Sequence, residues 1–167
     1  MIEYHTFNSP IGEITITAVK EGVIRISFYT EAHGEIVNFC EKYLGSKITH
    51  GKSYTNEAKG QILEYLSGNR KVLDFPVIHL NSPFRKKVLE AQRKIPYGET
   101  HSYSEVAKMV NNPRASRAVG SANAENPLPL YFPCHRIISS TGKLGGFGGG
   151  LPIKKFLLDL EGKNKTV

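Results

Sequence analysis

The hydrophobic pattern of this chain changes its period close to Ser82, and that change divides the fold into two parts. Before Ser82, apolar and polar residues alternate in three segments rich in Ile, Val, Thr and Phe, which is typical of strands: Ile2–Phe7, Glu13–Val19 and Val23–Phe28. Turn-forming residues separate these segments at 8–12 and 20–22. We therefore predict a small antiparallel meander, followed by helices over 35–44 and 58–66 and an extended connection over 72–80.

After Ser82 the spacing of apolar residues becomes helical. Ser82-Pro83 is a helix start, because a capping serine precedes a proline in the first turn. Ser102 and Glu105 have the spacing of a capping box. Further helices are predicted over 114–124 and 152–160. The tight turn at 111–113 favours a helix-turn-helix, a pattern that many helical pairs without DNA-binding activity share.

The predicted fold class is α/β (α+β). A small antiparallel-sheet domain over 1–81 supports a mainly helical, winged-helix-like domain with a helix-turn-helix over 82–167. The 167 residues are 40% hydrophobic and 22% charged, which excludes a disordered tail or a fibre. No apolar run could cross a bilayer, the first residues do not resemble a signal peptide, and two cysteines are too few for a disulfide framework. We expect a cytoplasmic protein with reduced thiols and no membrane partner.

The positive charge lies in the second half of the chain. Residues 1–81 carry eight Lys/Arg and nine Asp/Glu, a net charge of −1, whereas residues 82–167 carry fourteen Lys/Arg and six Asp/Glu, a net charge of +8. This asymmetry suggests a polyanionic partner such as nucleic acid. Charge alone leaves open the alternative that the lysines only improve solubility.

The segment predicted as the second helix of the pair is built almost entirely from small residues: Ala115, Ser116, Ala118, Gly120, Ser121 and Ala122. Arg114 and Arg117 are its only long side chains. Small residues allow a helix to approach a nucleic-acid groove closely, and they equally allow tight packing on a neighbouring helix. The pattern does not choose between these two interpretations.

Residues 126–138 contain the best candidate for a reactive group. Three prolines restrict the backbone before Cys134, and His135 and Arg136 follow it directly. A cation beside a thiol lowers its pKa and favours the nucleophilic thiolate, so we interpret Cys134 as a nucleophile. Cys40 lies on an apolar helical stripe and is interpreted as an inert core residue.

A glycine-rich loop follows, with five glycines in the six residues 145–150. It lacks the Gly-Lys-Ser/Thr ending of a Walker loop and the strand–Gly–helix context of a dinucleotide site. It is interpreted either as the wall of a pocket for a flat ring or as a flexible connector.

With Pro133-Cys134-His135-Arg136, the glycine-rich loop and the ending Leu-x-x-Glu161-Gly, the second half resembles the O6-alkylguanine-DNA alkyltransferases, also called methylated-DNA–protein-cysteine methyltransferases. Other shared motifs are Pro96-Tyr97-Gly98-Glu99-Thr100, Asn112-Pro113-Arg114-Ala115, Arg117-Ala118-Val119-Gly120 and Asn126-Pro127. The first half resembles the family only in its layout. The resemblance implies direct, single-turnover transfer of the alkyl group from O6-alkylguanine in DNA, and from O4-alkylthymine, to Cys134, without a cofactor.

The resemblance also implies roles for individual residues. His135 deprotonates Cys134 through a water, Glu161 orients His135, Tyr103 acts on the target nucleotide's phosphate and assists proton transfer, and Asn126 braces the helix-turn-helix. Arg117 fills the space of the flipped base, as the recognition helix enters the minor groove of double-stranded DNA. The other implied DNA contacts are Tyr103, Arg114, Ala115, Ser116, Ser121 and Arg136. The implied substrate pocket contains Pro129, Phe147, Gly148 and Gly149.

Two features bear on how far the resemblance extends. Many relatives have tyrosine where this chain has Phe147, and some have serine at Gly148, so the range of alkyl groups is left open. Some relatives hold a zinc ion in the first half, where this chain offers only Cys40 and scattered histidines, so we expect no metal.

We expect a monomer. The alternatives are a non-catalytic lesion-binding protein, which the presence of Cys134 disfavours, and, ranked last, a cysteine hydrolase.

Overall fold

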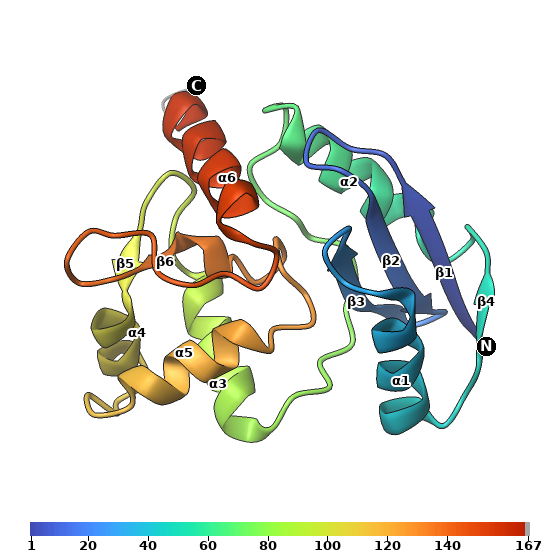
Figure 1. The fold of residues 1–167 in the computed structure, drawn as a ribbon, viewed down its shortest axis with the longest axis horizontal. Helices are drawn as coiled ribbons and strands as arrows, with labels where there is room; N and C mark the ends of the chain where they lie inside the picture. The colour runs from blue at the N-terminus through green and yellow to red at the C-terminus, as the bar shows by residue number, and fades with distance from the viewer. Residues whose placement is uncertain (166–167) are drawn as a thin grey trace. The chain divides into compact units, whose positions relative to one another are not determined.

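The computed structural model describes residues 1–165 and divides into two compact units, residues 1–80 and the chain from Asn81 onward. A small sheet with two helices forms the first unit, and short helices with a two-stranded ladder form the second (Figure 1). The predicted mixed fold, with a small sheet followed by a helical C-terminal part, is confirmed.

The sheet of the first unit has the strand order β3-β2-β1-β4. β1 (Ile2–Phe7), β2 (Ile14–Val19) and β3 (Gly22–Phe28) pair antiparallel, as the alternating pattern predicts. β4 (Ile48–His50), which the sequence did not predict, pairs parallel with β1 and extends the antiparallel meander. Three residues are too few to show a period, and β4 forms because β1 offers it an edge.

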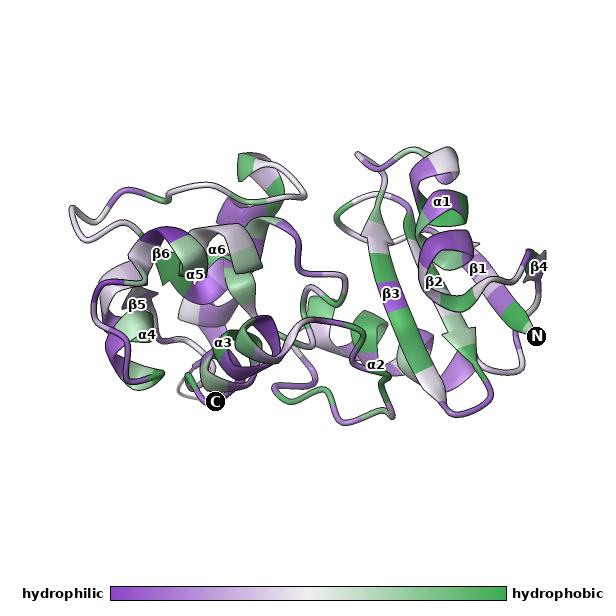
Figure 2. Ribbon diagram, turned by 90° about the horizontal axis from the view of Figure 1, so that it is seen from below, coloured by the Kyte–Doolittle hydropathy of each residue, from purple (hydrophilic) through white to green (hydrophobic). Residues whose placement is uncertain are grey.

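The helices of the first unit bury their apolar sides in its core. β3 is hydrophobic along most of its length (Figure 2). α1 (His33–Leu44) packs Cys40 against Ile2 and Ile24 and ends at Gly45, whose φ of 60° is the left-handed value that favours glycine. α2 (Asn56–Leu66) buries its own apolar stripe. Cys40 is therefore a core residue, as predicted.

The second unit begins with α3 (Pro83–Arg93), which Ser82 caps by accepting a hydrogen bond from the Arg85 N–H. β5 (His101–Ser102) leads directly into α4 (Tyr103–Met109) through the predicted capping box of Ser102 and Glu105. β5 pairs parallel with β6 (Ile137–Ile138), and Cys134 lies three residues before β6. This ladder therefore brings the start of α4 beside the cysteine segment.

Two helices of this unit differ in extent from their predictions. α5 (Ser116–Ala124) begins two residues late, because the Ala115 N–H bonds to the Asn112 carbonyl and leaves Arg114 and Ala115 in the turn. α6 (Leu151–Asn164) continues through Gly162, which was predicted as its end. The longer helix includes Glu161, whose side chain is bound by several donors from the cysteine segment and its surroundings.

Apolar residues from α3, α4, α5 and β6, together with Ile95 just after α3, form the core of the second unit; those from the named elements include Val88, Val106, Val119 and Ile137. Across residues 1–165, no helix combines the length and the apolar character needed to cross a membrane.

Candidate active site

Asn126 fixes the backbone that leads to Cys134. Its Nδ2 donates to the Phe132 carbonyl at 3.0 Å, and its Oδ1 accepts from the Leu128 N–H at 2.9 Å. The same segment holds Leu130 at a φ of 73°, a left-handed conformation that costs a non-glycine residue about 1 kcal/mol or more. Asn126 thus holds a strained loop in one shape directly before the cysteine.

Cys134, His135 and Arg136 form one turn of 3₁₀ helix rather than an extended strand. Pro133 removes one backbone donor, and the Cys134 N–H bonds to the Phe132 carbonyl at 2.7 Å, which tightens the chain into a turn. The 3₁₀ turn therefore does not place Cys134 and His135 on opposite faces, as neighbouring residues of an extended strand would be.

A buried ion cluster lies behind the turn. Glu161 Oε2 is 2.7 Å from His135 Nε2 and accepts from Arg136 Nη2 at 2.9 Å, while its Oε1 accepts from Arg136 Nε at 2.8 Å and from the Gly98 N–H at 3.1 Å. Arg136 Nη1 donates to the Ile95 carbonyl at 2.7 Å. Both carboxylate oxygens are therefore satisfied by donors from different parts of the unit.

These contacts determine the protonation state of His135. Burial opposes ionisation of Glu161, but the hydrogen bonds and charges of His135 and Arg136 outweigh it and hold the pKa of the carboxyl well below its usual range. Burial is the largest effect on His135 and lowers its pKa despite the opposing Glu161. A neutral imidazole beside an ionised carboxylate must carry its proton on Nε2, so Nδ1 is the basic nitrogen.

The thiol of Cys134 is buried, and burial raises its pKa to about 11. A hydrogen bond from Asn126 and the positive charge of Lys154 oppose this rise without cancelling it. The expected lowering of the pKa by His135 and Arg136 was wrong, because His135 is neutral and Glu161 compensates the charge of Arg136. The thiol is protonated at rest and needs a base when it reacts.

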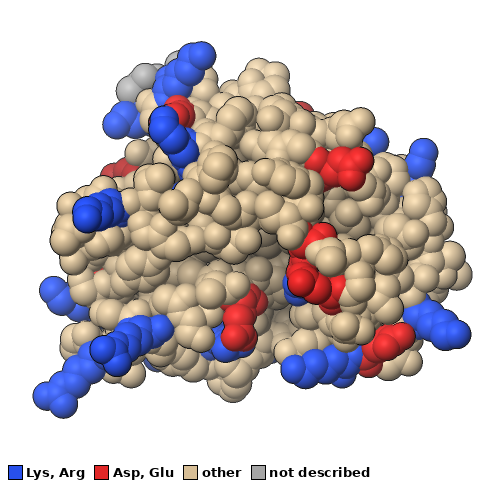
Figure 3. Space-filling model, viewed as in Figure 1, with Lys and Arg blue, Asp and Glu red and all other residues tan. Residues whose placement is uncertain are grey.

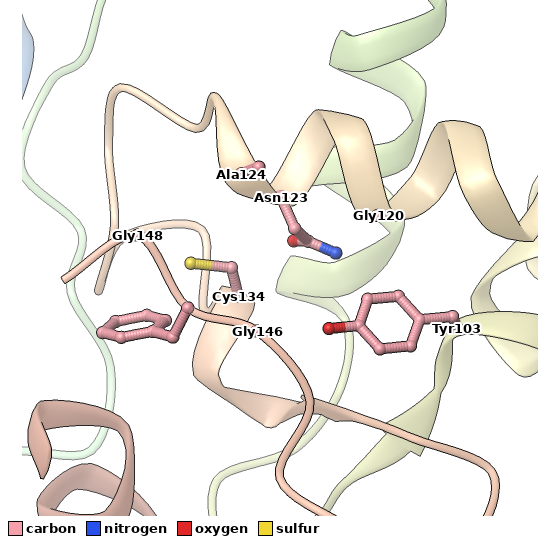
Figure 4. A pocket seen from close by; sticks show the side chains of 8 residues that line it. Tyr103, Gly120, Asn123, Ala124, Cys134, Gly146 and Gly148 are labelled. Atoms are coloured by element: carbon pink, nitrogen blue, oxygen red, sulfur yellow. The ribbon is translucent and has the colours of Figure 1, made fainter. Parts of the chain in front are cut away.

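Cys134 opens into a cavity of about 210 Å³. The residues that line it are Tyr103, Gly120, Asn123, Ala124, Cys134, Gly146, Phe147 and Gly148. Figure 4 shows the cysteine on one wall and the Tyr103 hydroxyl across the space. Burial raises the pKa of Tyr103, and a hydrogen bond with the Gly146 backbone opposes this. The cavity therefore presents a neutral nucleophile and a neutral acid to whatever enters it.

The glycine-rich loop forms one wall of the cavity because its backbone passes close to Tyr103. A Cβ atom on Gly145 would lie 2.9 Å from the Tyr103 hydroxyl, and Gly145 has a φ of 71°. Lys154, fully buried, donates from Nζ to the Ile137 carbonyl at 2.6 Å and to the Gly146 carbonyl at 3.2 Å. One ammonium group thus ties the loop to β6. Gly146, Phe147 and Gly148 line the cavity, an arrangement that favours the pocket-wall interpretation of the loop over a flexible connector.

Comparison with known proteins agrees with this geometry over both units. The family model for the 6-O-methylguanine DNA methyltransferase, DNA binding domain, matches residues 83–163, and the model for the ribonuclease-like domain of the same enzyme matches residues 2–78. The chain belongs to the 6-O-methylguanine DNA methyltransferase family.

Named relatives of this family cover nearly the whole chain. A methylated-DNA–protein-cysteine methyltransferase of Methanosarcina acetivorans is 39% identical, over 95% of this chain and 97% of its own. The constitutive enzyme of that name from Bacillus subtilis is 38% identical, over 95% and 94%. The crystal structure of Mycobacterium tuberculosis OGT in complex with DNA matches with a TM-score of 0.84 and 33% identity, over 97% and 94%.

Within this methyltransferase fold, several of the predicted site residues meet. Tyr103, Cys134, Phe147 and Gly148 line the same cavity, and His135 lies against Glu161. Pro129 and Gly149 do not line this cavity, and their place in the substrate pocket stays a prediction. The loop presents Gly146 instead.

Two predicted DNA contacts of the methyltransferase are not available at its surface. Arg136 is buried in the ion cluster with Glu161, and Ala115 is buried in the core of the second unit, so the predictions for both side chains were wrong. Arg136 follows the nucleophile in the sequence, but the 3₁₀ turn directs it inward.

The remaining predicted contacts lie on or beside α5, which has three distinct faces. Val119 and Ala122 point into the core, whereas Gly120, Asn123 and Ala124 border the cavity. Arg114, Arg117 and Ser121 are exposed and Ser116 is half-buried. Basic side chains project where α4 and α5 lie, at the lower left of Figure 3. The small residues therefore fit both interpretations: they allow tight packing on one side of α5 and leave an open surface on the other.

Among the polar side chains of the site, sequence analysis missed Lys154 and Asn123. A signal for Lys154 existed, because Lys154, Leu157 and Glu161 fall on one face of α6 and a lysine on a buried stripe is unusual. The sequence did not indicate a role for Asn123, because its neighbours in the cavity, Gly146 to Gly148, lie far along the chain. Among the described residues, no group of three His, Cys, Asp or Glu side chains is arranged to hold a metal ion.

Proposed function

We propose that this chain repairs O6-alkylguanine in DNA by transferring the alkyl group to its own Cys134 in a single turnover. The Sγ–carbon bond forms as the carbon–O6 bond breaks, and the electron pair of that bond stays with guanine, which takes a proton at N1. The thiol proton leaves through His135. The product is a thioether, so the protein is consumed. The observation that carries this proposal is the buried Cys134 that opens into the cavity beside a neutral His135 held by Glu161.

The pKa directions support general-base activation. A thiol whose pKa is about 11 exposes little thiolate at neutral pH, so attack is fastest if the proton is removed as the bond forms. His135 is suited to this role through Nδ1, by way of a water, because Glu161 fixes its tautomer. Tyr103 is suited to protonate the leaving guanine, and Asn126 is a positioning residue for the cysteine loop.

DNA is the partner, which the matching DNA-binding domain and the relative solved in complex with DNA support, and we propose that it is double-stranded. We propose that α5 enters the minor groove, that Arg117 occupies the space of the flipped base, and that Arg114, Ser116 and Ser121 lie along the DNA backbone. Arg117 and Ser121 are exposed on α5, Ser116 is half-buried at its start, and Arg114 is exposed in the turn before it. O4-alkylthymine is a further expected substrate. We propose that the protein works as a monomer in the cytoplasm.

The test is the intact mass of the protein after mixing with a duplex that contains one O6-methylguanine, followed by peptide mapping. We expect a gain of one methyl group at Cys134. Cys134→Ser is the matched control, and it should bind the duplex without gaining the group. Tight binding by the native protein without any mass gain would instead indicate a recognition protein.

A further inference from the structure

Asn123 is one of three polar side chains in the cavity wall, with Tyr103 and Cys134. It lies on α5 between Gly120 and Ala124, which also border the cavity. Figure 4 shows its carboxamide extending into the space between the cysteine and the Tyr103 hydroxyl. The two neighbouring positions that border the cavity, Gly120 and Ala124, are small and add little bulk beside the carboxamide.

The hydrogen-bonding capacity of this carboxamide is unused. Both Oδ1 and Nδ2 are buried, and neither has a hydrogen-bond partner among residues 1–165. A buried amide in this state costs roughly 1–3 kcal/mol relative to one that is bonded. Asn126, three residues later, uses both ends of its carboxamide on the backbone. Asn126 therefore has a structural explanation, and Asn123 has none within the protein.

We infer that Asn123 is a specificity-determining residue that hydrogen-bonds the flipped base; this inference rests on the proposed function. A carboxamide presents an acceptor and a donor side by side. O6-alkylation leaves N1 of guanine without a hydrogen, so the 2-amino group is flanked by acceptor nitrogens at N1 and N3. The 2-amino group donates to Oδ1, and the adjacent ring nitrogen accepts from Nδ2.

The same chemistry sets a preference between lesions. O4-alkylthymine presents only acceptors beside its alkylated oxygen, at N3 and O2, and can satisfy Nδ2 but not Oδ1. Leaving a buried site acceptor unpaired lowers affinity for the ligand that lacks the donor. Asn123 therefore favours guanine lesions over thymine lesions.

The test compares two lesions in the same duplex, O6-methylguanine and O6-methylhypoxanthine, which lacks only the 2-amino group. Single-turnover rates of methyl transfer are measured below saturation for the native protein, Asn123→Leu and Asn123→Ala. We expect the native protein to prefer O6-methylguanine about tenfold and both variants to lose that preference through a slower reaction with guanine. Leucine retains the bulk of asparagine and alanine opens the cavity, so agreement between them excludes a change of shape.

A stability measurement separates this role from a structural one. Asn123→Leu removes an unsatisfied buried amide, so its free energy of unfolding should equal or exceed the native value. A preference that persists in both variants, equal slowing with both lesions, or repair at the native rate overturns the role of Asn123. Failure of the native protein to methylate Cys134 with either lesion overturns the proposed function instead.

Discussion

At the scale of single residues, Glu161 connects stability to chemistry. The Glu161 side chain is only 1% exposed, and its carboxylate accepts hydrogen bonds from His135, Arg136 and Gly98. Charged pairs of this kind gain little over an apolar core, but removing one partner leaves the other charge buried and alone. The fold therefore depends on Glu161 even where the pair itself contributes little net stability.

We expect Glu161→Gln to lower the free energy of unfolding by about 3 kcal/mol, because Arg136 keeps its charge in a buried site without a counter-charge. Denaturant titration at pH 7.5 measures the change. Asp159→Asn on the same helix is the matched control, since its pair with Lys155 is exposed and should contribute under about 0.5 kcal/mol. Equal losses of unfolding free energy in the two variants would show that Glu161 is no more important for stability than an exposed carboxylate.

At the scale of elements, the glycine-rich loop must approach Tyr103 with backbone alone. We expect Gly145→Ala to displace the Tyr103 ring and to slow methyl transfer about tenfold, because its Cβ would lie 2.9 Å from the hydroxyl. The positive φ adds a backbone cost of about 1–2 kcal/mol. Single-turnover kinetics and denaturation measure the two effects separately.

The variant Gly142→Ala separates the cost of a positive φ from the effect of the contact with Tyr103. Gly142 has a φ of 84°, and a Cβ there would meet nothing within 4 Å. It should therefore show a similar loss of stability with a native repair rate. If Gly142→Ala slows repair as much as Gly145→Ala, the Tyr103 contact is not the cause.

The same scale separates what the sequence could predict from what it could not. The three long strands, the capping box at Ser102 and the αL end of α1 at Gly45 depend on neighbouring residues and are readable from local pattern. β4, the inward turn of Arg136 and the cavity position of Asn123 depend on partners far along the chain. Cys134 was recognisable as a motif, but its raised pKa follows from a burial that no short segment encodes.

At the scale of the whole molecule, the protonation state of the Cys134 thiol links the stability of the fold to the repair reaction. In the unfolded chain its thiol has the ordinary pKa of 9.0, whereas the folded value is about 11. Between these values the unfolded chain loses a proton that the folded chain keeps, so rising pH favours unfolding. The stabilising effect is complete below pH 9 and is lost as the pH rises through 11.

We therefore expect the native protein to lose about 2 kcal/mol more stability than its methylated form between pH 7.5 and pH 10.5. The thioether does not titrate, while the tyrosines and lysines that do are common to both forms and cancel in the comparison. Denaturant titrations at the two pH values, before and after reaction with a methylated duplex, measure the difference. Cys134→Ala is the control and should follow the methylated form. Parallel losses in the native and methylated proteins would mean that the thiol is not held protonated by burial, and the need for His135 as its base would disappear with it.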